Sequence, residues 1–587
     1  MVEQECTEVF VTRYTADFET TTDPETAHVW SWESCVVGDP DNFCRGIDIE
    51  SFIEYCSWED RIIYFHNLKF DSSYILSYLL THGYTWSNKR SLKKHEFSTL
   101  ISNMGQFYSV TVCFGETTTT FYDSLKLIRL SVEQIAKAYG LEMRKLEIDY
   151  DKPRPEGYIP TDEEWEYQHV DVAIMSQALH ILFTEGLTKI TQGSNALYDY
   201  KEIVGKKNFK RWFPVLSPEI DSFCRRSYKG GATQVHKIFA NQEIADGITL
   251  DVNSMYPWAM YEMPLPFGEP VHYNGKYRKD KCYPLYIQKL TCSFELKEGY
   301  IPTIQLKHSG IFRGTDFLES SDGNIVELTL TSVDLQLFLD HYNVYNIEWV
   351  EGYKFMKSTM MFKDYIDKWY AIKAQATKDG NKGLRQIAKD MMNSLSGKFG
   401  LRPEVQEKIP YYEDKLKFKL GEVEQRDSIY VPVVSFITSY GRDKALRSAQ
   451  KNYERFIYMD TDSLHLAGTE LPTNLDIDST KLGWWDLEKV WVRGYFIRAK
   501  TYIEEESVSR ETMESMIKSE KAEPWQFYEV DGDTRILNIT CAGMPKQCYK
   551  YVTYDNFRPS NWFDGKLMPV MTKNGITLVK KVFTIQP

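Results

Sequence analysis

A tight turn carrying two aspartates constrains this chain more than any other stretch. It lies in RFIYMDTDSLHL at residues 455–466, where apolar runs flank Asp460, Thr461 and Asp462. This pattern predicts a strand, a turn and a second strand. Two carboxylates at one hairpin tip repel each other unless a cation lies beside them. Taken alone, the stretch is also typical of a solvated acidic turn.

A second acidic strand favours the cation. In ITLDV at residues 248–252, alternation places Asp251 on the face opposite its apolar neighbours. One strand-borne carboxylate facing a hairpin-borne pair is the arrangement that two-metal phosphoryl transfer requires, with Mg²⁺ ions about 4 Å apart. The sequence therefore predicts a catalytic site that contains Asp251, Asp460 and Asp462.

The N-terminal part carries a second set of acids. Alternation in YTADFET puts Asp17 and Glu19 on one strand face, a pattern also typical of the wet side of an edge strand. Asp71 lies just before a predicted helix, and Tyr167 and Asp171 lie one helical turn apart. A two-metal 3′–5′ exonuclease needs such acids to hold the scissile phosphate and a tyrosine to orient the attacking water.

These stretches follow the order found in family B DNA polymerases. DVNSMYP at residues 251–257 resembles motif A (DxxSLYP), and YMDTDS at residues 458–463 resembles motif C (YxDTDS). The acidic N-terminal stretches resemble motifs Exo I, Exo II and Exo III, and further matches indicate the protein-primed branch. The resemblance implies an α/β and α+β multidomain fold. An RNase H-like 3′–5′ exonuclease domain would precede a right-hand polymerase with palm, fingers, thumb and two branch-specific insertions.

Two apolar stripes at helical spacing flank DGNKG at residues 379–383. They predict two antiparallel helices joined by a short turn. On the polar face of the second helix, Arg385, Lys389 and Asn393 lie at successive i+4 steps. Such a row is often only a solvated face, so its function depends on what faces it.

The second helix carries KDMMNSLSG at residues 389–397, which resembles motif B (KxxxNSxYG). The resemblance implies that Lys389 grips the incoming triphosphate and that Lys373 is a second phosphate ligand. Point charges of this kind suit a leaving pyrophosphate. Ser396 departs from the motif, which has a tyrosine at that position.

Further short matches complete the implied sites. YKGG at residues 228–231 resembles the YxGG motif, and its glycine pair permits positive φ and close backbone approach, although such pairs are also common in turns. The resemblance implies exonuclease catalysis by Asp17, Glu19, Asp71, Asp171, Tyr167 and Lys145. It implies DNA contacts at Thr20, His66, Asn67, Phe70, Ser124, Leu125, Tyr228, Gly230 and Gly231. It implies nucleotide and primer-end contacts at Tyr256, Val252, Lys373, Arg385, Asn393, Lys500 and Tyr502. The implied metal ligands are Asp251, Val252, Asp462, Asp17, Glu19, Asp71 and Asp171.

Two segments lack a counterpart in ordinary family B polymerases. Residues 263–361 contain strand-like runs with turns at Gly310 and Gly323, which is typical of an α+β module, and residues 398–427 alternate as a hairpin does. The resemblance implies that these are two terminal-protein regions, of which the hairpin closes a ring around DNA. The implied divisions are exonuclease 1–191, palm 192–262 and 428–532, first insertion 263–361, fingers 362–397, second insertion 398–427 and thumb 533–587.

Composition limits the setting. The net charge of −13 argues against a nucleic-acid partner unless basic tracks override it locally, and residues 373–398 hold six Lys or Arg against two Asp. The cysteines form no CxxC pair, and there is no apolar run of about 18 residues. We expect a protein with reduced thiols that works in a cytoplasm, without a membrane, and the resemblance implies a monomer in the host cell of a phage.

The sequence thus predicts a replicative, protein-primed DNA-directed DNA polymerase that proofreads and displaces strands processively. Its cofactors would be two Mg²⁺ ions per active site, with Mn²⁺ as a substitute. Its partners would be template and primer DNA, dNTPs, a terminal protein and a single-strand-binding protein. The alternatives are a repair or plasmid polymerase that extends DNA primers and a catalytically silent DNA-binding factor, against which the acids at both sites argue.

Overall fold

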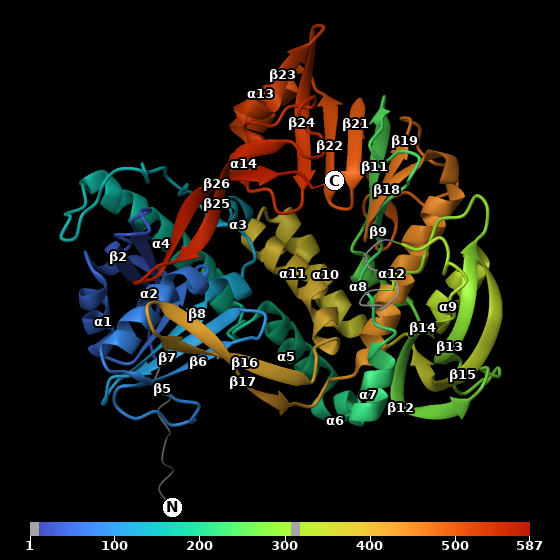
Figure 1. Cartoon of the computed structure of the whole chain (residues 1–587), viewed down its shortest axis with the longest axis horizontal. Coiled ribbons are helices and arrows are strands. Elements are labelled where there is room, and N and C mark those ends of the chain that lie inside the picture. The colour runs from blue at the N-terminus through green and yellow to red at the C-terminus, as the bar shows by residue number, and fades with distance from the viewer. Residues whose placement is uncertain (1–10, 307–316, 587) are drawn as a thin grey trace, which may run out of the picture.

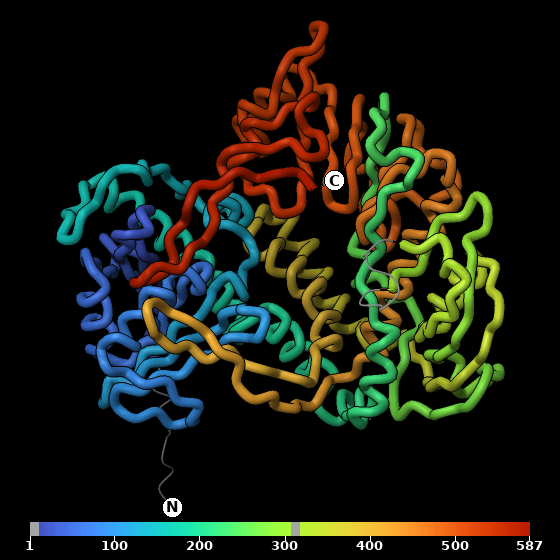
Figure 2. The backbone as a smooth tube through the Cα atoms, viewed as in Figure 1, coloured from blue at the N-terminus to red at the C-terminus, as the bar shows by residue number. Residues whose placement is uncertain are grey.

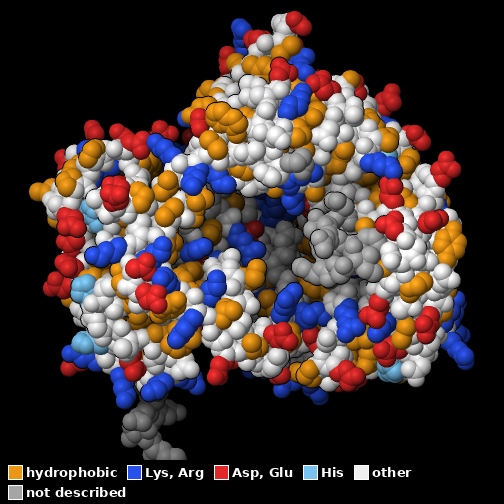
Figure 3. Space-filling view, viewed as in Figure 1, with side chains coloured by type: hydrophobic (Ala, Val, Ile, Leu, Met, Phe, Trp, Pro, Cys, Tyr) orange, Lys and Arg blue, Asp and Glu red, His pale blue; other side chains and the backbone are white. Residues whose placement is uncertain are grey.

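The computed structural model describes residues 11–306 and 317–586. Cys6 and the turn predicted at Gly310 lie outside these residues. In the described part, no helix is both long and apolar enough to cross a membrane. The sheets and helices of the described residues are arranged in a ring (Figure 1), and the space-filling view shows a hollow at its centre (Figure 3).

The first sheet places Asp17 and Glu19 in the interior of a domain. Its eight strands lie in the order β3-β2-β1-β4-β8-β7-β6-β5, and β1 pairs with β2 antiparallel and with β4 parallel. The acidic strand is therefore central, which excludes the edge-strand alternative. Helix α4 packs on the Asp17 face, where the Thr15 hydroxyl donates to the Val172 carbonyl at 3.0 Å. The elements are β1 (Arg13–Thr20), β2 (Val29–Val36), β3 (Asp39–Gly46), α1 (Ile49–Ser57), β4 (Arg61–Phe65), α2 (Leu68–Thr81), β5 (Thr85–Trp86), β6 (Glu96–Ile101), β7 (Phe107–Cys113), β8 (Thr118–Asp123), α3 (Val132–Tyr139) and α4 (Asp162–Thr184).

The acidic hairpin belongs to a five-stranded antiparallel sheet in the order β20-β11-β19-β18-β9. A second such sheet, in the order β10-β21-β22-β24-β23, lies next to it. Helices α8 and α12 cover the apolar face of the sheet that carries the acidic hairpin, where Ile248, Leu250 and Leu464 are buried. The elements are β9 (Thr233–Val235), β10 (Glu243–Ile244), β11 (Gly247–Val252), α8 (Met255–Glu262), α12 (Val431–Lys451), β18 (Phe456–Asp460), β19 (Ser463–Ala467), β20 (Trp485–Trp491), β21 (Arg493–Arg498), β22 (Thr501–Ser507), α13 (Arg510–Lys518), β23 (Phe527–Val530), β24 (Asp533–Cys541) and α14 (Lys546–Tyr549).

The segment that follows α8 folds as an α+β module, as its alternation predicts. Four strands pair antiparallel in the order β12-β15-β13-β14, and α9 packs against β13 and β14. The turn predicted at Gly323 is present, with φ +73° at that residue. The elements are β12 (Leu265–Asn274), β13 (Leu285–Leu296), β14 (Val326–Thr331), α9 (Ser332–His341) and β15 (Tyr342–Ser358).

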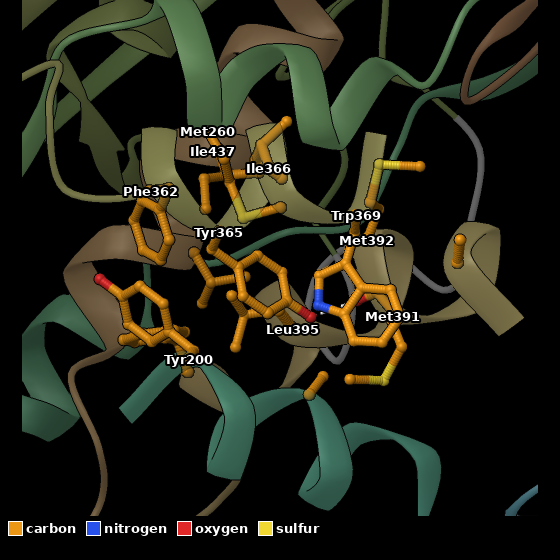
Figure 4. Packing of buried hydrophobic residues seen from close by; sticks show 14 of the residues in the cluster. Tyr200, Met260, Phe362, Tyr365, Ile366, Trp369, Met391, Met392, Leu395 and Ile437 are labelled. Carbon is orange, nitrogen blue, oxygen red and sulfur yellow. Dashed lines mark hydrogen bonds between the residues drawn. The ribbon is translucent and has the colours of Figure 1, made fainter. Parts of the chain in front are cut away.

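The two predicted stripes are the buried faces of an antiparallel helix pair, α10 (Lys363–Lys378) and α11 (Lys382–Phe399). Figure 4 shows Tyr365 and Trp369 of α10 pointing toward Met391 and Leu395 of α11. The Tyr365 hydroxyl donates to the Met391 carbonyl at 2.8 Å. Helix α5 (Gln192–Val204) packs against both members of the pair, whereas α6 (Lys206–Trp212) packs on α5 and α7 (Pro218–Arg225) packs on α12.

Two long hairpins reach the domain of the eight-stranded sheet and close the ring (Figure 2). Strand β16 packs against β6 and α2, and β26 packs against α2. The hairpin of β16 (Glu404–Tyr412) and β17 (Leu416–Gln425) contacts that of β25 (Trp562–Met571) and β26 (Ile576–Thr584) through a 3.1 Å hydrogen bond from Tyr412 to the Lys573 carbonyl. Tyr74 of α2 donates to the Ile576 carbonyl at 2.9 Å. Lys and Arg side chains gather around the hollow in Figure 3, so the acidic chain presents a basic interior.

Candidate active sites

The tip of the β18–β19 hairpin holds both aspartates of the D-T-D turn. Thr461 adopts φ +60°, and its amide donates to the Ala232 carbonyl at 2.7 Å. A Cβ on Gly231 would lie 2.4 Å from the Thr461 hydroxyl oxygen, so only glycine permits this approach. Close approach is therefore realised at Gly231. Neither Gly230 nor Gly231 adopts the positive φ that a glycine pair also permits.

Asp251 lies beside this turn. It pairs with Ser463 in the β11–β19 ladder, and the Val252 amide donates to the Asp462 carbonyl at 2.8 Å. Burial and the neighbouring Asp462 raise the pKa of Asp251 to about 7. Burial likewise raises the pKa of Asp462, with Asp460 adding to the effect. Asp251 and Asp462 thus lie close together in a partly buried region, where each carboxylate disfavours ionisation of its neighbours. The sequence predicts this grouping of the acids.

Asp460 differs from the other two acids because the protein already occupies its oxygens. Thr233 donates to Oδ1 at 2.9 Å, and Lys500 donates to Oδ2 at 2.5 Å. The Tyr458 hydroxyl also donates to Oδ2, at 3.3 Å, and accepts from the Lys500 amide at 3.0 Å. Asp460 therefore joins the hairpin to the β21–β22 turn, whereas Asp251 and Asp462 remain available for a cation.

The positive charge of Lys389 of α11 lies near these acids and lowers the pKa of both Asp251 and Asp462. Lys373 of α10 lies near it, since burial and the charges of Arg385 and Lys389 lower the pKa of Lys373. Lys373, Arg385 and Lys389 thus form one cationic group of the helix pair, and Lys389 brings its charge to the carboxylates. Arg385, Lys389 and Asn393 are exposed, as the polar row predicts.

Tyr256 and Tyr502 flank the acids on two sides. Tyr256 lies in α8, where burial raises its pKa to about 12, and a Cβ on Gly441 of α12 would lie 3.3 Å from its ring. The Tyr502 ring stacks on Phe496, with centroids 5.0 Å apart. Ser396 is buried within α11, so neighbouring atoms cover the position where the motif has a tyrosine.

The YKGG loop is held by an ion pair that no sequence motif indicates. Arg442 of α12 donates to the carbonyls of Lys229 and Gly230, each at 2.6 Å. Its other nitrogens bond Asp334 of α9 at 2.7 and 3.1 Å, and the side chains of Arg442 and Asp334 are both buried. Their separation of about a hundred residues hides the contact from pattern reading. Tyr228 packs against Gly400, where a Cβ would lie 2.7 Å from its ring.

The second acidic site forms where β1, α2 and α4 meet. Burial and the charge of Asp171 raise the pKa of Asp17 to about 7, and Lys145 opposes this shift. The pKa values of Glu19 and Asp71 lie well above their usual range, chiefly through burial and partly through repulsion by Asp17. The acids that the sequence grouped are thus close in space.

Lys145 and a tyrosine complete this site. The Lys145 ammonium bonds Asp171 and lies 3.2 Å from the Tyr167 hydroxyl. The Tyr150 hydroxyl lies 2.6 Å from that of Tyr167. Tyr150 was missed by the sequence prediction, although it stands only five residues after Lys145. One Asp171 oxygen, Oδ1, is buried without a hydrogen-bond partner.

The residues predicted to bind a single strand differ in exposure. Asn67 is exposed, and Thr20, Phe70 and Leu125 are partly exposed. His66 and Ser124 lie behind them. The His66 ring contacts the Ser124 hydroxyl at 3.1 Å and the Leu130 carbonyl at 2.7 Å, and Ser124 donates to the Phe65 carbonyl at 3.0 Å.

Both sites offer oxygen donors to a divalent cation. Across residues 11–306 and 317–586, no three His, Cys, Asp or Glu side chains already form a metal cage. A polymerase site needs fewer, because Mg²⁺ is usually held by one or two carboxylates together with substrate phosphates. Mutual repulsion between neighbouring acids fits a cation at either site. The Asp171 oxygen without a hydrogen-bond partner fits a cation at the N-terminal site.

Comparisons with known proteins agree with this geometry. The family described as DNA polymerase type B, organellar and viral, matches residues 57–160 and 153–480. The chain is 41% identical over 582 residues to the DNA polymerase of Bacillus phage Nf and 40% identical to that of Bacillus phage phi29, covering 98% of this chain and 99% of each relative. The solved structure of phi29 DNA polymerase complexed with primer-template DNA and incoming nucleotide substrates superposes with a TM-score of 0.89 at 40% identity, covering 98% of this chain and all of that one. The chain therefore belongs to the family B DNA polymerases, in the group of phage enzymes that includes phi29 DNA polymerase.

Proposed function

We propose that this polymerase replicates a phage genome in the host cytoplasm by adding the first nucleotide to a hydroxyl of a terminal protein. It then elongates processively with strand displacement and proofreads with its own 3′–5′ exonuclease. The observation that carries the proposal is the pair of inserted units, the β12–β15 module and the β16–β17 hairpin. They follow α8 and α11 in the chain, which are the positions that the resemblance implies for the two terminal-protein regions. We also propose that the exonuclease, palm, fingers, thumb and two inserted regions have the boundaries that the resemblance implies.

In the polymerase site, Asp251, Asp462 and the Val252 carbonyl would hold two Mg²⁺ ions, or Mn²⁺ in their place. The bound metal would neutralise charge on the reacting phosphate. Lys389, Lys373 and Arg385 would bind the triphosphate, with Asn393 beside it, and favour pyrophosphate departure. Tyr256 would wall the sugar pocket against a 2′-hydroxyl. Lys500 and Tyr502 would steady the primer end so that its 3′-hydroxyl is aligned with the α-phosphate.

In the exonuclease site, Asp17, Glu19, Asp71 and Asp171 would hold the cations. Tyr167 would orient the attacking water, and Lys145 would balance the negative charge around the scissile phosphate. The exposed Asn67 and the partly exposed Phe70 would contact the frayed strand, since an aromatic ring supports a base by stacking. The carboxylates of the two sites come from different domains, so each activity can be removed by itself.

The proposal is tested by nucleotide transfer to protein. The enzyme, labelled dATP and Mg²⁺ are incubated with the products of neighbouring phage genes, and labelled protein is separated on a denaturing gel. We expect one protein to carry a covalent nucleotide, and Asp462→Asn to abolish it. A single-strand-binding protein is expected to stimulate the later elongation. Extension of DNA primers without labelling of any partner protein would contradict protein priming.

The β12–β15 module is the proposed docking surface for the priming protein. Exposed charges there are available for substitution, such as Lys279, Lys281 and Glu298. Reversing them should weaken nucleotide transfer to protein several-fold and leave extension of a DNA primer unchanged. Equal loss of both activities would show that the module serves polymerisation in general.

A further inference from the structure

A buried ionic group lies directly behind the polymerase carboxylates, and no step proposed above uses it. Glu504 of β22 and His465 of β19 are 0% and 1% exposed. His465 Nδ1 lies 2.7 Å from Glu504 Oε1, and the Lys489 ammonium of β20 lies 3.2 Å from Glu504 Oε2. We call His465, Lys489 and Glu504 the buried triad.

The sheet register places the triad next to Asp251. Thr249, two residues before Asp251 and on the same face of β11, pairs with His465 on one side and Lys489 on the other. Glu504 comes from the neighbouring sheet, and the Thr249 hydroxyl lies within 3.2 Å of His465 Nδ1. One carboxylate thus joins β22 to three strands of the sheet that carries the catalytic acids.

The triad fixes the position of β22 because the partners of the buried Glu504 carboxylate, which are His465, Lys489 and the Thr249 hydroxyl, all lie on the neighbouring sheet. Burial raises the pKa of Glu504, but the charges of His465 and Lys489 outweigh it and bring the pKa below its usual value. A buried carboxylate that loses its partners is strongly unfavourable, so such networks allow few arrangements of the strands they join. Displacing β22 would break both contacts at once.

The strand that the triad holds is the one that carries the proposed primer-end residues. Tyr502 lies two residues before Glu504, on the same face of β22. Its ring contacts His465 and Tyr458, with centroid distances of 5.1 and 5.0 Å. His465 therefore contacts both Glu504 and Tyr502. Lys500 lies in the β21–β22 turn, directly before the first residue of β22.

We propose that the buried triad positions β22 so that Lys500 and Tyr502 hold the primer 3′ end in the polymerase site. It thereby sets the fraction of ends that are extended rather than passed to the exonuclease. The triad contacts no reacting atom, so its members are positioning residues. The inference rests on the proposed primer-end role of Lys500 and Tyr502.

Adjacent glutamates of β22 provide a matched test. Glu505 is 1% exposed, is paired with Arg535 at 2.9 Å and faces away from the catalytic sheet. Glu504→Gln and Glu505→Gln therefore make the same chemical change at equal burial. The readout is the dNTP concentration at which half of a labelled primer is extended rather than degraded.

We expect Glu504→Gln to raise this concentration about tenfold, the effect of losing one charge-assisted contact. Glu505→Gln should change it less than twofold. With Asp17→Ala and Glu19→Ala added to remove degradation, Glu504→Gln should raise KM for primer-template about tenfold and leave kcat at saturating primer unchanged. A merely structural loss would lower the activity of both glutamine variants alike.

Two further variants separate the possible failures. If Lys500→Ala and Tyr502→Ala leave the balance unchanged, the proposed primer-end role is wrong. If they shift it while Glu504→Gln matches Glu505→Gln, that role stands and the triad only stabilises the fold, which overturns the inference. Should Glu504→Gln not fold, His465→Phe keeps the packed ring and removes the bond to Glu504, and the same comparison with Glu505→Gln decides.

Discussion

Removing one buried carboxylate from the exonuclease site should stabilise the metal-free enzyme. The pKa of Asp17 is about 7, against 3.8 for the free side chain, mainly because it is buried. At 1.36 kcal/mol per pKa unit, an ionised Asp17 costs the fold about 4 kcal/mol at most. Since Glu19, Asp71 and Asp171 share the repulsion, we expect Asp17→Asn to recover about half, or about 2 kcal/mol.

The sign of the pH dependence follows from the raised pKa. Because the folded state binds this proton more tightly than the unfolded chain, stability falls as pH rises from about 4 to about 7. The advantage of Asp17→Asn should be full at pH 8, shrink steadily as the pH falls below about 7, and be nearly absent only at about pH 4 and below. In EDTA at pH 8, a stabilisation of about 2 kcal/mol by Asp17→Asn corresponds to a rise of about 4–8 °C in the melting temperature of a domain as large as the proposed exonuclease unit, residues 1–191.

The assay is thermal unfolding with and without Mg²⁺, with Asp41→Asn on the exposed edge strand β3 as the control. Mg²⁺ should stabilise the wild-type protein and reduce or invert its difference from Asp17→Asn, because metal binds only the intact acid group. A lower melting temperature for Asp17→Asn in EDTA at pH 8 would refute the reasoning, since the acids would then not repel one another.

Three further outcomes follow from the polymerase site and the basic interior. Because Asp251 must be ionised to bind metal and has a pKa of about 7, the Mg²⁺ concentration for half-maximal primer extension should rise about fivefold from pH 7 to pH 6; a constant requirement would contradict that pKa. Tyr256→Val should raise ribonucleotide incorporation more than about tenfold by opening the sugar pocket, and unchanged discrimination would show that another residue excludes the 2′-hydroxyl. Duplex affinity should fall with salt at a log–log slope steeper than about −3, at about −0.9 per phosphate contact, whereas a flat response would mean that the Lys and Arg side chains of the hollow do not touch phosphate.

Elements with a clear hydrophobic period were predictable from the sequence. Helices α10 and α11, the β18–β19 hairpin and the strand before Asp251 each have a face whose apolar residues repeat at the period of the element. The grouping of acids into two sites followed from their order and resemblance. The environment of each acid did not, because burial depends on which strands become neighbours.

Contacts between distant segments were not predictable. Nothing near Asp460 indicates that Lys500 occupies its Oδ2, and nothing near Gly230 indicates Arg442. Ser396 illustrates the same limit: the motif suggests a missing ring, whereas the fold buries the serine under its neighbours. The glycine pair permits either positive φ or close backbone approach, and the fold uses the second through the missing Cβ of Gly231.

The separation of the two active sites is the central claim, and one labelled primer-template tests it. The wild-type enzyme should degrade the primer without dNTPs and extend it with them. Asp462→Asn should abolish extension and keep degradation, and Asp17→Ala with Glu19→Ala should do the reverse. If either change removed both activities from a folded protein, or if Asp462→Asn still extended the primer at the wild-type rate, the assignment of the two sites would be wrong.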